Sequence, residues 1–236
     1  MASESLHRIS VEEYLALERR SETKSEYLHG ETYAMAGASR SHNLIAGNVF
    51  AALHQQLPGR GCEVYSNDMR LRASAADLLT YPDVAVSCDP QFADEEVDTL
   101  LSPTLIIEVL SPSRESYDRG AKFGAYRAIP SFAEYLLLAQ EPGLCAEHFV
   151  KQPAGGWLLT ETRRPEDVLD LPSIGCTLAM RDVYERVDLP GRGQQPGPAG
   201  QPDPPSASRN TSSISAAAVS HRNRAACSIP RAFSSS

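Results

Sequence analysis

Long apolar segments are absent from this chain of 236 residues, although 42% of them are hydrophobic. No run approaches the roughly 20 apolar residues that a membrane-spanning helix needs. Residues 1–10 also lack the apolar stretch of a secretion signal. Phosphate-binding P-loops and the Gly-x-Ser-x-Gly signature are missing, which argues against P-loop NTPases and serine hydrolases of that type. We therefore expect a cytoplasmic protein with no membrane partner.

Cysteine is scarce and scattered. The chain contains Cys62, Cys88, Cys145, Cys176 and Cys227, and no two of them have the Cys-x-x-Cys spacing of zinc or redox motifs. The odd number and wide spacing predict free thiols, as expected in a reducing cytosol.

Positive charge is in deficit, because the net charge is −8. From Pro190 onward five arginines face one aspartate, a net of +4, which leaves −12 for the preceding part. An acidic body argues against broad nonspecific binding to nucleic acid, although it permits a local basic groove. Residues 190–236 are rich in Pro, Gly and Ser, so we predict one domain over residues 1–189 and a disordered basic tail over 190–236.

Hydrophobic periodicity predicts helices and strands in a mixed order. A capping box of Ser10 and Glu13 begins the first helix, and Gly30 marks the turn of a hairpin over 27–33. Further helices are expected at 41–56, 116–128 and 179–186, and strands at 64–72, 81–87, 104–110, 134–139, 144–151, 156–162 and 168–171. An acidic loop is expected at 89–98. This order predicts a mixed α/β (α+β) fold with a central sheet flanked by helices.

Two acidic residues interrupt strands that are predicted to be buried. Asp83 lies in the segment 81–86, and Glu108 lies in the apolar segment 105–110. A carboxylate on a buried strand is costly unless it is paired or holds a metal. If the two strands are neighbours, both side chains can converge on one Mg²⁺ or Mn²⁺ ion, and Lys122 can orient water or offset developing charge. This constellation predicts hydrolysis of phosphodiester bonds.

Each of these residues also has a purely structural explanation. Asp83 can be a solvated loop residue, and Glu108 can pair with Arg70 or Arg72. Lys122 can form an i,i+4 pair with Asp118 on a solvated helix face. Three further residues stay open: Glu31 can be solvent-exposed, His42 can cap a helix or contact phosphate or a metal-bound water, and Asp68 can support the site. Gly120 and Gly124 are costly inside a helix and suggest that this helix approaches the sheet closely.

The motifs, taken in order, resemble the Uma-two family of restriction endonucleases, within the PD-(D/E)xK nuclease superfamily. They are Tyr-Leu-His-Gly-Glu (27–31), Ser-His-Asn-Leu-Ile-Ala-Gly-Asn (41–48), Tyr-Pro-Asp-Val (81–84), Ile-Glu-Val-Leu-Ser-Pro-Ser (107–113) and Tyr-Asp-Arg-Gly-Ala-Lys (117–122). The resemblance covers about residues 8–188. It implies a restriction-endonuclease-like core and an Mg²⁺-dependent endonuclease (Mn²⁺ being an alternative) whose substrate is DNA.

Carried over to this chain, the resemblance makes Asp83 and Glu108 the metal ligands and Glu31 an additional N-terminal acid. The superfamily lysine normally follows the second acid by two positions, where this chain has Leu110, so the resemblance assigns that part to Lys122. His29 stands where the family often has Asp or Asn. A homodimer is expected by analogy alone. Two alternatives remain, a nuclease-like fold that binds nucleic acid or protein without cutting, and an adaptor that uses the basic tail.

Overall fold

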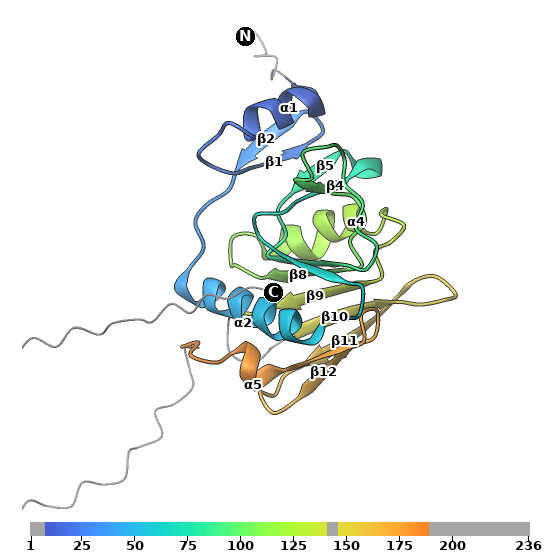
Figure 1. The fold of residues 1–236 in the computed structure, drawn as a ribbon. Coiled ribbons are helices and arrows are strands. Elements are labelled where there is room, and N and C mark those ends of the chain that lie inside the picture. Colours follow the sequence, from blue (N-terminus) through green and yellow to red (C-terminus); the bar gives the residue numbers. More distant parts are fainter. Residues whose placement is uncertain (1–7, 141–145, 189–236) are drawn as a thin grey trace, which may run out of the picture. The chain divides into compact units, whose positions relative to one another are not determined.

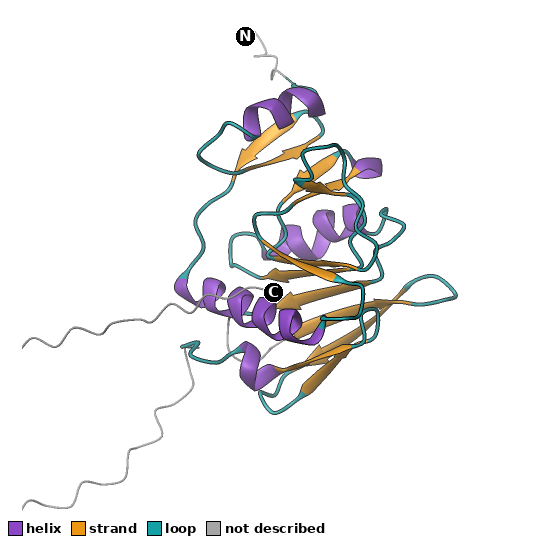
Figure 2. Ribbon diagram, viewed as in Figure 1, coloured by secondary structure: helices purple, strands orange, loops and turns teal. Residues whose placement is uncertain are grey.

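Three β-sheets and the helices packed on them make up residues 8–140 and 146–188, the part of the chain that the computed structural model describes (Figures 1 and 2). The helices are α1 (Val11–Glu18), α2 (Arg40–Gln56), α3 (Glu115–Tyr117), α4 (Phe123–Tyr126) and α5 (Met180–Val183), with a short 3₁₀ turn η1 (Ser74–Ala76) and a π-helical turn η2 (Asp118–Lys122). The predicted mixed α/β class with flanking helices is confirmed. The tail 190–236 lies outside the described residues.

The first sheet carries the N-terminal hairpin. Its strands follow the order β2-β1-β5-β4-β7, with β1 (Ser25–Leu28), β2 (Glu31–Ala34), β4 (Arg70–Ala73), β5 (Leu78–Thr80) and β7 (Thr99–Leu100). The hairpin turn has positive φ at His29 (52°) and Gly30 (89°), as a type I′ turn requires. The predicted capping box of Ser10 and Glu13 is present at the start of α1.

The second sheet forms the centre of the fold. Its order is β11-β10-β9-β8-β6-β3, with β3 (Glu63–Ser66), β6 (Val84–Ser87), β8 (Leu105–Val109), β9 (Glu134–Leu138), β10 (Ala146–Lys151) and β11 (Trp157–Thr162). Strands β8 and β9 run parallel, and the other neighbours pair antiparallel. A third, two-stranded sheet joins β12 (Val168–Leu171) to β13 (Cys176–Ala179).

Strand β8 is buried on both faces. Leu105, Ile107 and Val109 belong to the same core cluster as the apolar side of α2. Ile106 packs instead in the cluster that contains Phe123 and Tyr126 of α4. Burial on both faces explains the uninterrupted apolar sequence of this strand. Glu108 lies two positions after Ile106 on the strand, so its side chain points to the same face, toward α4.

Two predicted elements are divided in the structure. The strand expected at 64–72 is broken at a turn in which the Met69 amide donates to the Ser66 carbonyl, and its halves join different sheets as β3 and β4. The helix expected at 116–128 contains the π-helical turn η2 between α3 and α4. The close approach inferred from Gly120 and Gly124 is wrong, because a Cβ atom at either position would meet nothing within 4 Å.

The prediction that the cysteines are free is wrong for one pair. Cys62 and Cys88 form a disulfide. Strands β3 and β6 pair with Glu63 opposite Ser87, so the next position outward brings these two cysteines face to face. Cys176 is free and buried, whereas Cys145 and Cys227 lie outside the described residues. Within residues 8–140 and 146–188, no helix is long and apolar enough to cross a membrane.

Candidate active site

The ends of β6 and β8 bring Asp83 and Glu108 to the same cleft. The two strands pair antiparallel with Val84 opposite Ile107, so Asp83 and Glu108 are the next positions along this register. Residues directly opposite each other in such a pair have side chains on the same face. Both carboxylates line a cleft of about 550 Å³. The expectation that the two strands are neighbours is therefore confirmed.

Glu108 is buried, with 4% of its surface exposed. Its Oε1 atom lies 2.8 Å from Nζ of Lys122 and accepts a hydrogen bond of 2.9 Å from the hydroxyl of Tyr126. Burial raises the pKa of Glu108 to about 8, because desolvation and the nearby acids outweigh the effect of Lys122. The alternative pairing with Arg70 does not occur, since that guanidinium contacts Tyr81, Thr99 and Asp98 instead.

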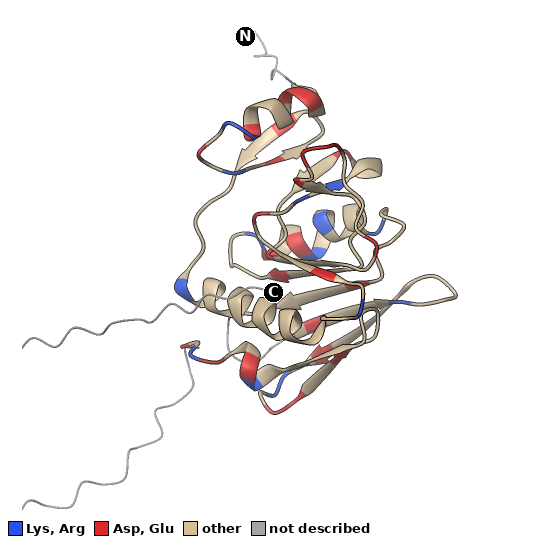
Figure 3. Cartoon of the chain, in the orientation of Figure 1, with Lys and Arg blue, Asp and Glu red and all other residues tan. Residues whose placement is uncertain are grey.

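Lys122 lies at the end of the π-helical turn η2 and is 3% exposed. Its Nζ atom is 2.8 Å from Glu108, 3.4 Å from Glu26 and 3.7 Å from Asp118. Desolvation opposes the charged form, but these carboxylates together raise the pKa of Lys122. The i,i+4 pair with Asp118 exists, yet it is buried beside the cleft rather than solvated. Figure 3 shows acidic and basic positions close together along this segment.

Glu26, which the sequence analysis did not select, belongs to this group, and Glu31 does not. Glu26 lies on β1, is 2% exposed, and forms ion pairs with Lys122 and Arg114. Burial alone would raise the pKa of Glu26, but Lys122, the Thr80 hydroxyl and Arg114 lower it overall. Glu31 lies past the hairpin turn on β2, where it accepts a hydrogen bond from Tyr33. The hairpin predicted at 27–33 begins one residue after Glu26, whereas β1 starts at Ser25, so the strand argument that identified Glu108 did not reach Glu26.

Asp83 is held through one carboxylate oxygen. Oδ2 accepts a hydrogen bond of 2.7 Å from the backbone N–H of Val109 and lies 3.1 Å from Nε2 of His42. His42, whose role the sequence left open, therefore lines the cleft beside Asp83. Asp68 is exposed and pairs with Lys24 at the cleft edge, away from the buried carboxylates.

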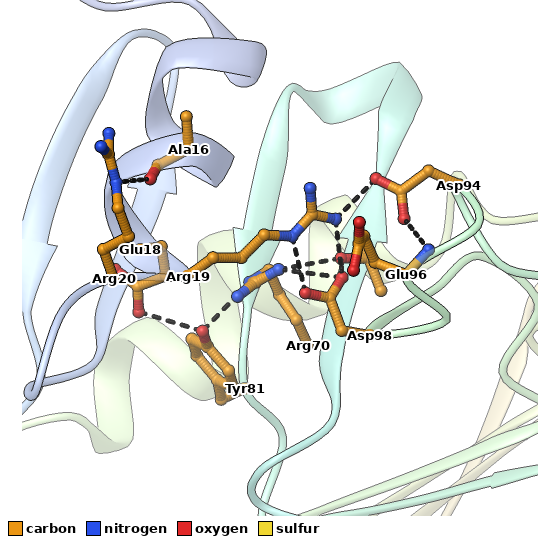
Figure 4. A network of polar contacts seen from close by, with 10 residues as sticks. Ala16, Glu18, Arg19, Arg20, Arg70, Tyr81, Asp94, Glu96 and Asp98 are labelled. Carbon is orange, nitrogen blue, oxygen red and sulfur yellow. Dashed lines mark hydrogen bonds and ion pairs between the residues drawn. The ribbon is translucent and has the colours of Figure 1, made fainter.

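A polar network anchors the residue that precedes Pro82 and Asp83 (Figure 4). The Tyr81 hydroxyl accepts a hydrogen bond of 3.0 Å from Nε of Arg70 and donates one of 3.0 Å to Glu18 of α1. The network continues to Asp98, which binds both Arg70 and Arg19. Helix α1 and strand β4 thus fix the start of the segment that carries Asp83.

The donor set suits a hard divalent cation. Among the described residues no three His, Cys, Asp or Glu side chains are grouped closely enough to hold a metal by themselves. Mg²⁺, however, is commonly held by one or two carboxylates and keeps several waters. Asp83 and Glu108 supply two carboxylates to one cleft, and the contacts described above engage one oxygen of each. The residues present therefore fit Mg²⁺ or Mn²⁺.

Comparisons with known proteins identify the family and the fold of this chain. The Uma2 family, described as "Putative restriction endonuclease", matches residues 11–181. Two uncharacterized proteins of Synechocystis sp. are similar: slr1290, 36% identical over 75% of this chain and 92% of its own length, and sll1609, 39% identical over 65% and 86%. The fold is similar to the crystal structure of a "putative nuclease belonging to DUF820" from Anabaena variabilis, with a TM-score of 0.58, 19% identity, and coverage of 75% of this chain and 98% of that one. The chain belongs to the Uma2 family of restriction-endonuclease-like proteins.

Proposed function

We propose that this protein is a divalent-metal-dependent endonuclease that hydrolyses phosphodiester bonds in DNA. One observation carries the proposal. Asp83, Glu108 and Lys122 come from three separate segments, and all three line one cleft. Two carboxylates and one ammonium in a shared cleft are the groups that hydrolysis of a phosphodiester requires.

In this proposal, Asp83 and Glu108 would hold Mg²⁺ or Mn²⁺, which when bound supplies Lewis-acid stabilisation of phosphate charge and a more acidic water. The ammonium of Lys122 offsets negative charge that develops on the phosphate and orients the attacking water. Glu26 and Asp118 keep that ammonium charged and fixed in place. Tyr126 restrains the carboxylate of Glu108 from the other side.

The test is cleavage of supercoiled plasmid by the full chain with Mg²⁺ or Mn²⁺, beside Glu108→Gln and Asp83→Asn. These substitutions preserve size while they remove the charge that a cation needs. Glu12→Gln is a matched control, because Glu12 is exposed in the first turn of α1 and away from the cleft. We expect cleavage by the parent and the control alone. Full activity of either site variant would contradict the proposal, and a parallel RNA substrate tests the preference for DNA.

A second candidate is a nuclease-like fold that binds nucleic acid or protein without cutting it. It is favoured by the ammonium of Lys122, which already neutralises the buried carboxylates, and by the raised pKa of Glu108. This candidate predicts no binding of Mg²⁺ or Mn²⁺ at millimolar concentration. Calorimetric titration of the full chain separates the two functions, because the endonuclease requires a metal site that Asp83→Asn removes.

A further inference from the structure

His42 contacts Asp83 although it comes from a different part of the fold. Its Nε2 atom lies 3.1 Å from Oδ2 of Asp83, and the two side chains are 15% and 14% exposed. The same oxygen accepts the backbone N–H of Val109 at 2.7 Å. The Val109 amide and the His42 imidazole therefore both contact one oxygen of the carboxylate.

The position of His42 does not arise from helix capping. The cap of α2 is Ser39, whose Oγ accepts a hydrogen bond from the backbone N–H of His42. The imidazole takes no part in that bond, so its contact with Asp83 is independent of the need to satisfy the first turn of the helix.

The start of α2 is itself tied to the end of β8. The Ser39 hydroxyl donates to Oε1 of Gln140 at 2.7 Å, and Nε2 of Gln140 donates to the carbonyl of Leu110 at 2.6 Å. Farther along α2, Ile45, Val49 and Leu53 are fully buried in the core. These contacts fix the helix relative to the strand that carries Glu108, so the direction from which His42 reaches Asp83 is set by the fold.

We infer that His42 is a positioning residue that orients the carboxylate of Asp83 for cation binding. This inference rests on the proposed function. The contact with Nε2 of His42 and the hydrogen bond from the Val109 amide hold Oδ2, which leaves Oδ1 to face the cation. Partners that orient a ligand in this way commonly change metal affinity about 10–100-fold when they are removed.

Two amide substitutions test whether a polar atom at the position of Nε2 is what matters. The amide nitrogen of glutamine lies as many bonds from the backbone as Nε2 of histidine, whereas that of asparagine corresponds to Nδ1. His42→Gln can therefore keep a polar contact with Asp83, and His42→Asn cannot. His54→Gln is the matched control, because His54 lies exposed on the same helix and lines a different cleft.

The readout is Mn²⁺ affinity, measured by calorimetry on the full chain without nucleic acid, with thermal unfolding to verify that each variant is folded. We expect His42→Asn to bind Mn²⁺ about 10–100-fold more weakly, with His42→Gln and His54→Gln close to the parent. Parent-like affinity of His42→Asn, or equal weakening by both His42 variants, would overturn the inference. Asp83→Asn tests the proposed function itself. If this variant binds Mn²⁺ as the parent does, or if the parent binds no Mn²⁺, both the proposed function and the inference about His42 fail.

Discussion

The ammonium of Lys122 lies 2.8 Å from Oε1 of Glu108, although the position two residues after this glutamate is occupied by leucine. Leu110 is buried among apolar side chains and provides no polar group to the cleft. The lysine enters instead from the π-helical turn η2, which follows β8 in the chain. Turns of this kind are often found at functional sites. The charge expected beside the second acid is thus supplied by a different element.

Replacement of this lysine affects stability and activity together. In Lys122→Met, the carboxylates of Glu108 and Glu26 lose their shared buried cation. Removing one partner of a buried ion pair typically costs about 3–5 kcal/mol in the free energy of unfolding. We expect a loss of this size in urea unfolding, together with loss of plasmid cleavage. Lys151→Met, at the exposed end of β10, is the control and should change neither quantity.

A double variant separates the two effects of that substitution. Adding Glu26→Gln to Lys122→Met removes one of the unpaired negative charges. The double variant should therefore lose less free energy of unfolding than the two single variants lose in sum. The difference should exceed about 0.5 kcal/mol, because contacting residues do not behave additively. Cleavage should stay absent, because the ammonium is still missing. Strict additivity would show that the contact between Lys122 and Glu26 contributes no coupling.

Local patterns predicted most of the secondary structure and the two acids of the central sheet. The capping box at Ser10, the turn at Gly30 and the alternation around Glu108 each follow from neighbouring residues alone. Asp83 and Glu108 were identified because charge is rare on apolar strands. Their convergence needed only the pairing of β6 with β8, which the structure contains.

Features that depend on long-range contacts could not be predicted in this way. The pairing of Cys62 with Cys88 follows from the β3–β6 register, which no short motif encodes. His42 reaches Asp83 only because α2 is docked at the end of β8. A helical pattern also does not reveal a π-helical turn, since its apolar spacing resembles that of an ordinary helix.

Glu26, rather than Glu31, is the N-terminal acid that pairs with Lys122 beside the cleft. Glu26→Gln should weaken the ion pairs with Lys122 and Arg114 and lower the free energy of unfolding by about 3 kcal/mol. Cleavage should also fall, because Lys122 loses one of its three carboxylate neighbours. Glu31→Gln should stay within about 0.5 kcal/mol of the parent, as is usual for surface positions, and cut normally. If Glu31→Gln lost stability and cleavage while Glu26→Gln kept both, Glu31 rather than Glu26 would belong to the site.

The disulfide predicts a dependence of stability on redox conditions. Cys62 and Cys88 are separated by 26 positions, and closing a loop of that size stabilises a protein by about 3–4 kcal/mol in the chain-entropy model. Oxidised parent should therefore unfold at higher urea than Cys62→Ser, and a reducing agent should remove most of the difference. Mass spectrometry of an unreduced digest should recover the two linked peptides. Parent and variant with the same midpoint under oxidising conditions would refute the bond.

Stability in acid tests the polar network around Asp98. Hydrogen bonds from Arg19, followed by the contacts of Thr99 and Arg70, lower the pKa of Asp98 in the folded protein. Because the folded pKa lies below the unfolded value of about 3.9, the ionised carboxylate contributes its full stabilisation above that value and loses it as the pH falls below it. The free energy of unfolding measured with urea should be higher for the parent than for Asp98→Asn. This difference should be constant from pH 7 to pH 5 and should shrink below pH 4. An advantage that grows on acidification would mean that the carboxylate is protonated more readily in the folded state, contrary to the observed arginine contacts.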